Sequence, residues 1–336
     1  MNIQLVTPAP LRFNNGNKIT ALRWAKILRN LGHRVKVVQQ YDSSPCDALI
    51  ALHARRSYQS IRRFYRIYPE RPLIVVLTGT DLYRDIRTHR SAQRSLQLGT
   101  RIVALQKMAL SELSDSLQSK TRVIYQSAER CLSSHSRKRG DKFKVSVIGH
   151  LRKEKDPLRT ALAIRRLPKQ SQIQVQHIGR ALDEDLERRA RAEMGRSPRY
   201  RWIGELPHQR TRKILAQSDI TVITSRMEGS SNVLSEALAC GVPVIASRIP
   251  GLMGTLGTDY PGYFAAGDTL ALSEILFRAE TDRKFYRSLQ SICKSLSPLV
   301  APKRERAAWQ QLLQELIKKA PRVSRVSPKA RADKPA

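Results

Sequence analysis

Two glutamates on either side of a short loop of small residues are the side chains best suited to recognise a ligand. They are Glu228 and Glu236, and the loop begins Gly229-Ser-Ser-Asn232. The loop opens a short helix, whose first N–H groups lack intrahelical partners and whose dipole favours an anion. A carboxylate only accepts hydrogen bonds, which suits the hydroxyl groups of a ribose or a hexose. The segment predicts two hydroxyl-binding carboxylates beside a phosphate site formed by the amides of Gly229, Ser230, Ser231 and Asn232, as a nucleotide-sugar requires.

The elements around this loop place it at the edge of a parallel sheet. An apolar strand is expected at residues 219–224, and Gly241-Val-Pro243 leads into a second strand at 242–246. The order strand, loop, helix, strand is typical of a parallel sheet covered by helices. Ligands of such sheets bind where the strands end, so the loop is expected to line a binding cleft.

A cluster of cations follows another expected strand, at residues 144–148. It reads Gly149-His-Leu-Arg152-Lys-Glu-Lys155, and it should face the same cleft. Departure of a nucleoside diphosphate builds negative charge, which fixed cations stabilise. A solvated basic loop is the alternative interpretation.

The spacing of the two glutamates resembles the acidic signature of GT-B glycosyltransferases of the family 4 type, the retaining-type group that includes glycogen and sucrose synthase-like enzymes. The resemblance implies that Glu228 touches the donor sugar and that Glu236 holds the ribose. In that group an Arg after the Gly and a Lys five residues on bind the diphosphate. Lys155 matches that Lys, whereas His150 stands where the Arg is usual, so Arg152 is expected to supply the second charge. The resemblance thus assigns catalytic roles to Lys155, Arg152 and Glu228, and donor binding to Gly149, His150, Gly229, Ser230, Ser231, Asn232 and Glu236.

The remaining sequence alternates between strand and helix patterns in two blocks. The pattern predicts an α/β fold of two Rossmann-like, doubly wound domains with an interdomain cleft, which is the GT-B architecture. The expected boundaries are 1–135 for an acceptor domain, 136–142 for a linker and 143–300 for a nucleotide-sugar domain. A helix at 301–320 is expected to pack back towards the first domain, and the basic, apolar-poor segment 321–336 reads as a disordered tail.

Three strand ends of the first domain are expected to bind the acceptor. Arg55 and Arg56 could hold a phosphate-bearing acceptor with paired hydrogen bonds, and His53 and Asp81 are the two candidates for a general base. The candidate acceptor-binding residues are Gly16, Asn17, His53, Arg55, Arg56, Thr80 and Asp81. A simple turn at Gly16 and the start of a helix at Arg55 are the alternatives.

Several further strings resemble the selenosugar synthases of selenoneine biosynthesis. They are His53-Ala-Arg-Arg-Ser57, Leu77-Thr-Gly-Thr-Asp-Leu-Tyr83-Arg84-Asp85, Gly149-His-Leu-Arg-Lys-Glu-Lys-Asp-Pro157, Ser225-Arg-Met-Glu-Gly229 and Asp259-Tyr-Pro-Gly-Tyr-Phe264. The resemblance runs from Met1 to about Leu289. It implies transfer of a sugar, typically N-acetylglucosamine, from a UDP-sugar to selenophosphate. Selenophosphate is strongly anionic and already ionised, so arginines (Arg84 among them) would orient it without a strong base. No metal and no cofactor other than the UDP-sugar co-substrate is expected.

The charge of the chain leaves two other interpretations open. Its 336 residues carry 61 Lys and Arg against 28 Asp and Glu, a formal net charge of +33, which predicts attraction to anions. One alternative is a glycosyltransferase with an ordinary hydroxyl acceptor, such as a lipid-linked one that docks through the basic helix around Arg62. Another is a nucleic-acid-binding protein on an idle scaffold, although no nucleic-acid-binding motif is found. Core packing is the favoured interpretation of the apolar face of the helix around Arg62.

The four cysteines and the absence of targeting signals bear on location. Cys46, Cys131, Cys240 and Cys293 are widely spaced, which argues against a zinc site and against a disulfide scaffold. No apolar run is long enough to span a bilayer, and the first residues read as a strand instead of a signal peptide. A cytoplasmic location is therefore expected.

Overall fold

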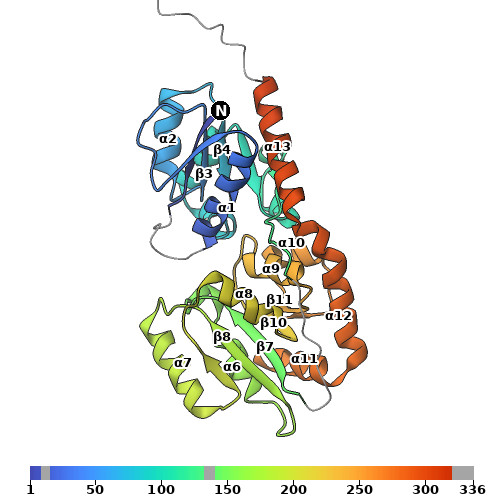
Figure 1. Ribbon diagram of the computed structural model, residues 1–336. Helices are drawn as coiled ribbons and strands as arrows, with labels where there is room; N and C mark the ends of the chain where they lie inside the picture. The colour runs from blue at the N-terminus through green and yellow to red at the C-terminus, as the bar shows by residue number, and fades with distance from the viewer. Residues whose placement is uncertain (9–15, 132–140, 320–336) are drawn as a thin grey trace, which may run out of the picture.

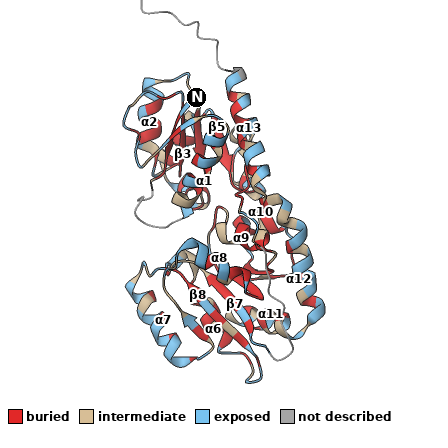
Figure 2. Cartoon of the chain, viewed as in Figure 1, coloured by how far each residue is buried: buried red, intermediate tan, exposed pale blue. Residues whose placement is uncertain are grey.

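A computed structural model describes residues 1–8, 16–131 and 141–319, which contain two six-stranded parallel sheets. The predicted tail at 321–336 and most of the predicted linker at 136–142 lie outside the described residues. Figure 1 shows the two sheets one above the other, with the first at the N-terminal end. In Figure 2 the inner strands of both sheets are buried, whereas edge strands such as β2 and β9 are partly exposed. Such burial explains the continuous apolar runs of the strands, because parallel sheets are covered on both faces.

The first sheet has the strand order β2-β1-β3-β4-β5-β6. Its side chains alternate between two cores: Leu5 and Ile50 point to one face, Val6 and Leu49 to the other. The strands are β1 (Asn2–Val6), β2 (Arg34–Val38), β3 (Ala48–Leu52), β4 (Leu73–Val76), β5 (Arg101–Ala104) and β6 (Thr121–Val123).

The second sheet has the order β12-β11-β10-β7-β8-β9. Its central strand is β10, which pairs with β7 and β11. The strands are β7 (Phe143–Ile148), β8 (Ile173–Ile178), β9 (Tyr200–Trp202), β10 (Ile220–Ile223), β11 (Val244–Ser247) and β12 (Tyr263–Phe264).

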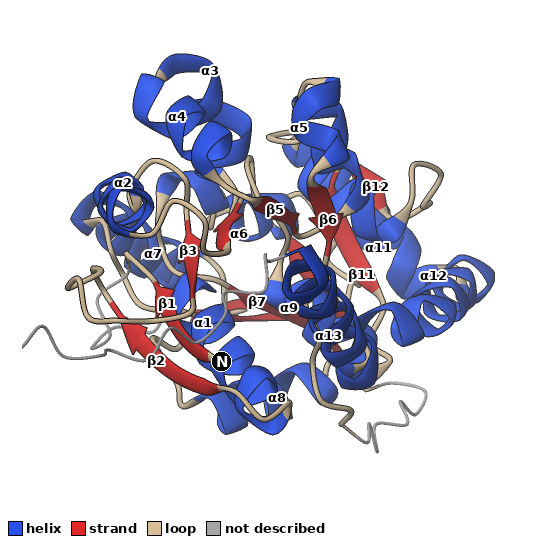
Figure 3. Ribbon diagram, turned by 90° about the horizontal axis from the view of Figure 1, so that it is seen from above, coloured by secondary structure: helices blue, strands red, loops and turns tan. Residues whose placement is uncertain are grey.

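Helices cover both faces of the first sheet. Viewed from above, α2 and α4 lie on one side, and α1 and α13 on the other (Figure 3). Ile61 and Phe64 of α2 are fully buried, so its apolar face packs in the core, as the favoured interpretation of this helix requires. The helical segments that precede the second sheet are α1 (Gly16–Asn30), α2 (Tyr58–Ile67), the π-helix η1 (Asp81–Asp85), α3 (Ile86–Thr88), α4 (Arg90–Leu98), the 3-10 helix η2 (Lys107–Glu112) and α5 (Asp115–Ser119).

The helices that accompany and follow the second sheet include the one that begins at the small-residue loop. This helix is α9 (Asn232–Cys240). The others are η3 (Lys153–Lys155), α6 (Arg159–Ile164), α7 (Glu184–Arg196), α8 (His208–Ala216), α10 (Pro250–Leu256), α11 (Thr269–Thr281), α12 (Arg283–Leu296), η4 (Ser297–Val300) and α13 (Pro302–Lys319).

The last helix packs against the first sheet. Trp309 of α13 is fully buried and meets Trp24 of α1 edge to face, with 4.8 Å between ring centroids. Leu312, Leu313 and Leu316 belong to the same core cluster as the strand residue Ile50. The chain therefore returns from the second sheet to complete the core of the first.

Two local differences from the sequence patterns have physical reasons. The sequence pattern of residues 108–117 predicts a single helix, but the chain becomes extended at Leu113 and a new helix begins after Ser114. Asp81–Asp85 forms a π-helix where no helix is expected, because Asp81 binds backbone groups that local propensity does not reveal. Among the described helices, none is both long and apolar enough to cross a membrane.

Candidate active site

The carboxylate of Glu228 lies against the amino group of Lys155. Lys155 Nζ donates a hydrogen bond to Glu228 Oε1, and Ser225 Oγ donates to the same oxygen at 2.7 Å. Glu228 is 8% exposed, so its charge is held in a protected position. The structure thus brings together two predicted catalytic residues that are far apart in sequence.

The turn that carries Lys155 is fixed by the end of β10. Thr224 Oγ1 donates to the carbonyl oxygens of Lys155 and Asp156, each at 2.9 Å. Asp156 adopts a left-handed conformation with φ of 44°. Lys155 therefore projects from a braced turn instead of a free loop.

The neighbouring residues of the glycine turn have different surroundings. His177 lies against the Gly149 carbonyl oxygen, with 3.0 Å between Nε2 and O, and burial lowers the pKa of His177 to about 4. His150 Nδ1 accepts a hydrogen bond from the Arg180 backbone N–H at 3.0 Å, so this histidine braces the adjoining chain. Arg152 is exposed, and within the described part of the chain its side chain forms no ion pair. Its backbone carbonyl oxygen accepts a hydrogen bond from Lys155 N at 3.0 Å, so the two residues belong to one turn.

The helix α9 begins where the motif predicts. Ser231 is its N-cap, with Oγ accepting from Leu234 N at 3.3 Å, and Gly241 ends it with φ of 69°. The first turn of α9 contains no acidic residue, which leaves its positive end free of a competing carboxylate. Gly229 and Ser230 precede this cap in the loop.

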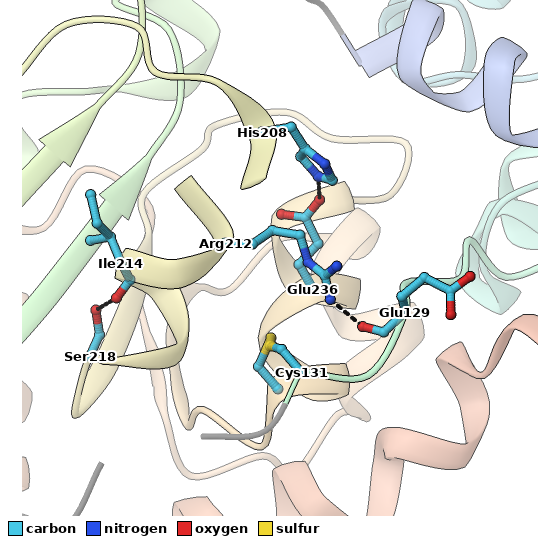
Figure 4. The surroundings of a disulfide bond; sticks show 8 residues. Glu129, Cys131, His208, Arg212, Ile214, Ser218 and Glu236 are labelled. Carbon is cyan, nitrogen blue, oxygen red and sulfur yellow. Dashed lines mark hydrogen bonds and ion pairs between the residues drawn. A yellow bond between two sulfur atoms is a disulfide. The ribbon is translucent and has the colours of Figure 1, made fainter. Parts of the chain in front are cut away.

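The second glutamate has a partner that the motif does not include. His208, at the start of α8, pairs with Glu236, with 2.7 Å between Nε2 and Oε1 (Figure 4). This hydrogen bond raises the pKa of His208, and partial burial opposes the change. The side chain of Glu236 is 11% exposed, whereas that of His208 is 58% exposed, so the histidine is the more readily displaced partner.

A disulfide bond ties the segment between the two sheets to α9. Cys131 is bonded to Cys240, and their Cα atoms are 4.8 Å apart (Figure 4). Arg212 of α8 donates to the Glu129 carbonyl oxygen beside it. Cysteine spacing argued against a disulfide scaffold and did not reveal this single bond, because the two residues are 109 positions apart and meet only through the tertiary fold.

The turn after β4 approaches the small-residue loop. A Cβ on Gly79 would lie 2.8 Å from Gly229 N, so both positions need glycine for this close approach. Asp81 holds the turn: its carboxylate accepts from the N–H groups of Ala54, Thr78 and Gly79 at 2.8–2.9 Å. These bonds occupy both oxygens of the buried Asp81 carboxylate, so its geometry is that of a brace and does not favour the general base that was one of its predicted roles.

The other candidate base lies in a charged cluster. His53 is buried, has φ of 70°, and its Nε2 is 3.0 Å from Thr80 Oγ1. Burial lowers the pKa of His53, and Asp81 opposes that change. A neutral imidazole can accept a proton, and a non-glycine residue at positive φ is uncommon enough to suggest function.

The two predicted acceptor arginines differ in freedom. Arg55 Nε pairs with the buried Asp85 at 3.2 Å, and Nη1 lies 2.8 Å from His89 Nε2. Arg84 pairs with Asp85 from the other side at 3.1 Å. Arg56 is exposed and forms no ion pair among the described residues. Asp85 thus neutralises part of the charge that would face an anionic acceptor.

Gly16 lies beside the donor side of the cleft. It is the first residue of α1, and Asn232 Nδ2 donates to its carbonyl oxygen at 3.5 Å. Asn17 follows it in the first turn. This end of α1 is therefore next to the start of α9, which is the proposed donor side, although Gly16 and Asn17 were expected to bind the acceptor.

Sequence reasoning missed Arg23, His208 and Asp85. Each makes its contact with a residue distant in sequence, such as Glu305 for Arg23 and Glu236 for His208. The only local signal was an ion-pairing side chain near a motif, which is too common to be selective.

A small pocket joins the predicted donor residues, lined by Gly149, Lys155, Ser225 and Ser231 among others.

Part of the chain matches a known family. Residues 132–294 match the model of the glycosyl transferases group 1. The chain is also 32% identical over 78 residues to N-acetyl-alpha-D-glucosaminyl L-malate synthase of Bacillus anthracis, and 31% identical over 94 residues to 2-deoxystreptamine N-acetyl-D-glucosaminyltransferase of Streptomyces fradiae. These alignments cover 23% and 28% of this chain, but only 20% and 22% of the two curated relatives.

Solved structures resemble nearly the whole chain. HepE of Anabaena, in complex with UDP and glucose, superposes with a TM-score of 0.74 at 16% identity, over 94% of this chain and 100% of that one. Sucrose-phosphate synthase of Thermosynechococcus elongatus gives 0.76 at 15% identity, over 94% and 99%. The fold is therefore the predicted GT-B fold.

Proposed function

We propose, from the group 1 glycosyl transferase match in residues 132–294, that this chain is a UDP-sugar-dependent glycosyltransferase. The observation that carries the proposal is the Lys155–Glu228 pair beside the start of α9. A cation, a carboxylate and a helix start together suit a donor that has a diphosphate and a sugar. The UDP in the HepE structure named above supports the choice of nucleotide.

The donor roles follow from the chemistry of each group. The diphosphate would accept hydrogen bonds from the first amides of α9, and Glu236 would accept from the ribose hydroxyls in place of His208. Glu228 would accept from a sugar hydroxyl. Lys155, aided by Arg152, would stabilise the charge that develops on UDP as the bond to the sugar breaks.

N-acetylglucosamine is the proposed sugar. One curated relative is named for the transfer of N-acetylglucosamine, and the other for the synthesis of an N-acetylglucosaminyl product. Their similarity is confined to a small part of each chain, and the donor assay below compares this sugar with glucose directly.

Selenophosphate is the proposed acceptor, on the strength of the resemblance to selenosugar synthases. In this reaction the selenium forms a bond to the anomeric carbon while the bond from that carbon to UDP breaks. Water then cleaves the phosphorus–selenium bond, releasing phosphate and the free selenosugar. The cations Arg55, Arg56 and Arg84 lie in or beside the cluster around His53 and would orient this anion.

A hydroxyl acceptor on a lipid carrier is the second candidate. Tyr65 and Ile67 of α2 are 39% and 45% exposed beside Arg62 and Arg66. Apolar and cationic side chains on one helix surface suit an anionic membrane. This acceptor would require a general base, for which His53 has the better geometry.

Mass spectrometry of the products tests these proposals. The protein is incubated with UDP-N-acetylglucosamine or UDP-glucose, and with selenophosphate, thiophosphate or no acceptor. A selenium-containing hexosamine that forms only with selenophosphate is the expected product. UDP release without it would refute the selenium acceptor but retain the transferase, whereas no binding of UDP or any UDP-sugar would refute the donor class.

A further inference from the structure

Arg23 of α1 connects three parts of the molecule. Its Nε donates to Glu305 of α13 at 3.0 Å, and its Nη1 donates to Asn232 Oδ1 at 3.0 Å. Asn232 is the first residue of α9. One guanidinium therefore links a helix of the first sheet and the last helix of the chain to the loop proposed to bind the donor.

The Glu305 end of this link is rigid. The Glu305 carboxylate is fully buried and also accepts from Trp24 Nε1 at 2.6 Å, from Ser127 N at 3.1 Å and from Ser127 Oγ. Trp24 and Ser127 supply three donors besides Arg23 and hold the carboxylate in place, so it fixes the Arg23 guanidinium in turn. The position of Arg23 is thus set by the first domain, independently of the donor loop.

The Asn232 end is where a ligand is proposed to bind. Its Nδ2 donates to the Gly16 carbonyl oxygen, so both ends of the amide face the first domain. Arg23 Nη2 is buried and has no hydrogen-bond partner among the described residues. Buried donors of this kind are rare in folded proteins. Because Arg23 Nη2 lies beside the proposed donor site, we interpret it as a group that gains its hydrogen-bond partner when a ligand binds.

We propose that Arg23 is a positioning residue for the donor site. It holds Asn232, and with it the first turn of α9, in the arrangement that receives the donor diphosphate. Donor binding consequently depends on contact between the two domains. This inference rests on the proposed function, because it takes UDP as the ligand of α9.

Arg23→Lys separates the two contacts. A lysine retains the charge that Glu305 requires but lacks the fork that reaches Glu305 and Asn232 together. We expect the variant to fold and to bind UDP about tenfold more weakly, a loss equivalent to one hydrogen bond to a polar partner. Uridine, which lacks phosphates, should bind it as it binds the unaltered protein.

Asn232→Ala breaks the same contact from the other side and leaves the Arg23–Glu305 pair intact. If Arg23 acts through Asn232, the double variant should bind UDP no more weakly than the more affected single variant. Lys26→Gln, at an exposed position of α1, is the matched control and should leave UDP affinity unchanged.

Calorimetric titration with UDP and with uridine measures these affinities, and circular dichroism verifies folding. Additive losses, equal losses for UDP and uridine, or unchanged UDP affinity in a folded Arg23→Lys protein would each overturn the proposal. If Arg23→Lys does not fold, the selective loss of UDP affinity in Asn232→Ala decides. Failure of the unaltered protein to bind UDP would instead overturn the proposed function, and this inference with it.

Discussion

At the residue scale, the charge of Lys155 is shared between Glu228 and the proposed leaving group. Its amino group donates a hydrogen bond to Glu228. As the bond between the sugar and UDP breaks, negative charge develops on the diphosphate, which then attracts the Lys155 amino group more strongly than before. The ion pair therefore holds the Lys155 amino group in position beside the proposed leaving group.

Removing this cation should slow the chemical step. For Lys155→Ala we expect kcat to fall about 10²-fold, because one charge that stabilises the transition state is lost. Lys153→Ala, on the same turn but exposed, is the control and should keep its activity. UDP release measured at saturating donor gives kcat. A folded Lys155→Ala protein with unchanged kcat would contradict the role.

His208 should make UDP binding dependent on pH. Its pKa is raised by the hydrogen bond to Glu236, and the other groups that act on it are the cations Arg212 and Arg23. UDP that displaces His208 returns this pKa towards 6.5 and releases a proton, so this group makes affinity rise as the pH increases above about 6.5, until His208 is neutral in the free protein as well. Titrations of UDP over this range should show the rise in the unaltered protein and lose that component in His208→Ala. Identical profiles would show that Glu236 keeps its histidine when UDP binds.

The sequence predicts only part of the site. Contacts within a local motif can be predicted, whereas contacts between residues far apart in sequence cannot. Glu228, Glu236 and the start of α9 lie within one local pattern of loop, helix and turn, so their arrangement follows from short-range physics. The contact between Arg23 and Glu305 spans 282 positions and depends on the complete fold. One partner of the Asp81 carboxylate, the N–H group of Ala54, is likewise distant in sequence, although the other two, Thr78 and Gly79, are its near neighbours.

At the scale of elements, buried strands and regular amphipathic helices are the most predictable. Helix α12 begins and ends where its pattern predicts, at Arg283 and Leu296. Helix α4 (Arg90–Leu98) was missed because its short, polar sequence has few apolar positions to mark a periodic face. Its stability comes from packing on α2 through Ala92 and Leu96, which no local pattern reveals.

The disulfide between Cys131 and Cys240 should contribute measurably to stability. It closes a sequence separation of 109 residues, so its reduction should lower the free energy of unfolding by about 2–4 kcal/mol. Urea unfolding with and without dithiothreitol measures the difference. Cys131→Ser is the control, because the reductant should have no further effect on it. Equal stability of the reduced and oxidised protein would contradict the prediction.

At the scale of the whole molecule, the charge of +33 is much larger than donor binding requires. Many of its arginines are exposed on α2 and α4, which contain no acidic residue. Such surfaces attract polyanions without reading their sequence. The excess charge therefore bears on association and location more than on catalysis.

Duplex DNA should bind weakly and without sequence preference. We expect its affinity to fall steeply as salt rises, because binding releases condensed counterions, and UDP should not displace it. Fluorescence anisotropy with two unrelated labelled duplexes, at several salt concentrations, measures this. A clear preference for one duplex that persists at high salt would instead favour the nucleic-acid-binding alternative.

The return of α13 to the first sheet has a consequence for synthesis on the ribosome. Trp309, Leu312, Leu313 and Leu316 complete a core whose other buried members lie between Ile3 and Ile124, so the early part of the chain emerges long before its last packing partners. The core of the second sheet also takes residues from late helices, but its last buried member is Val300, which precedes α13. The domain that is translated first is therefore expected to acquire its final packing last, after every buried member of the second core has been synthesised.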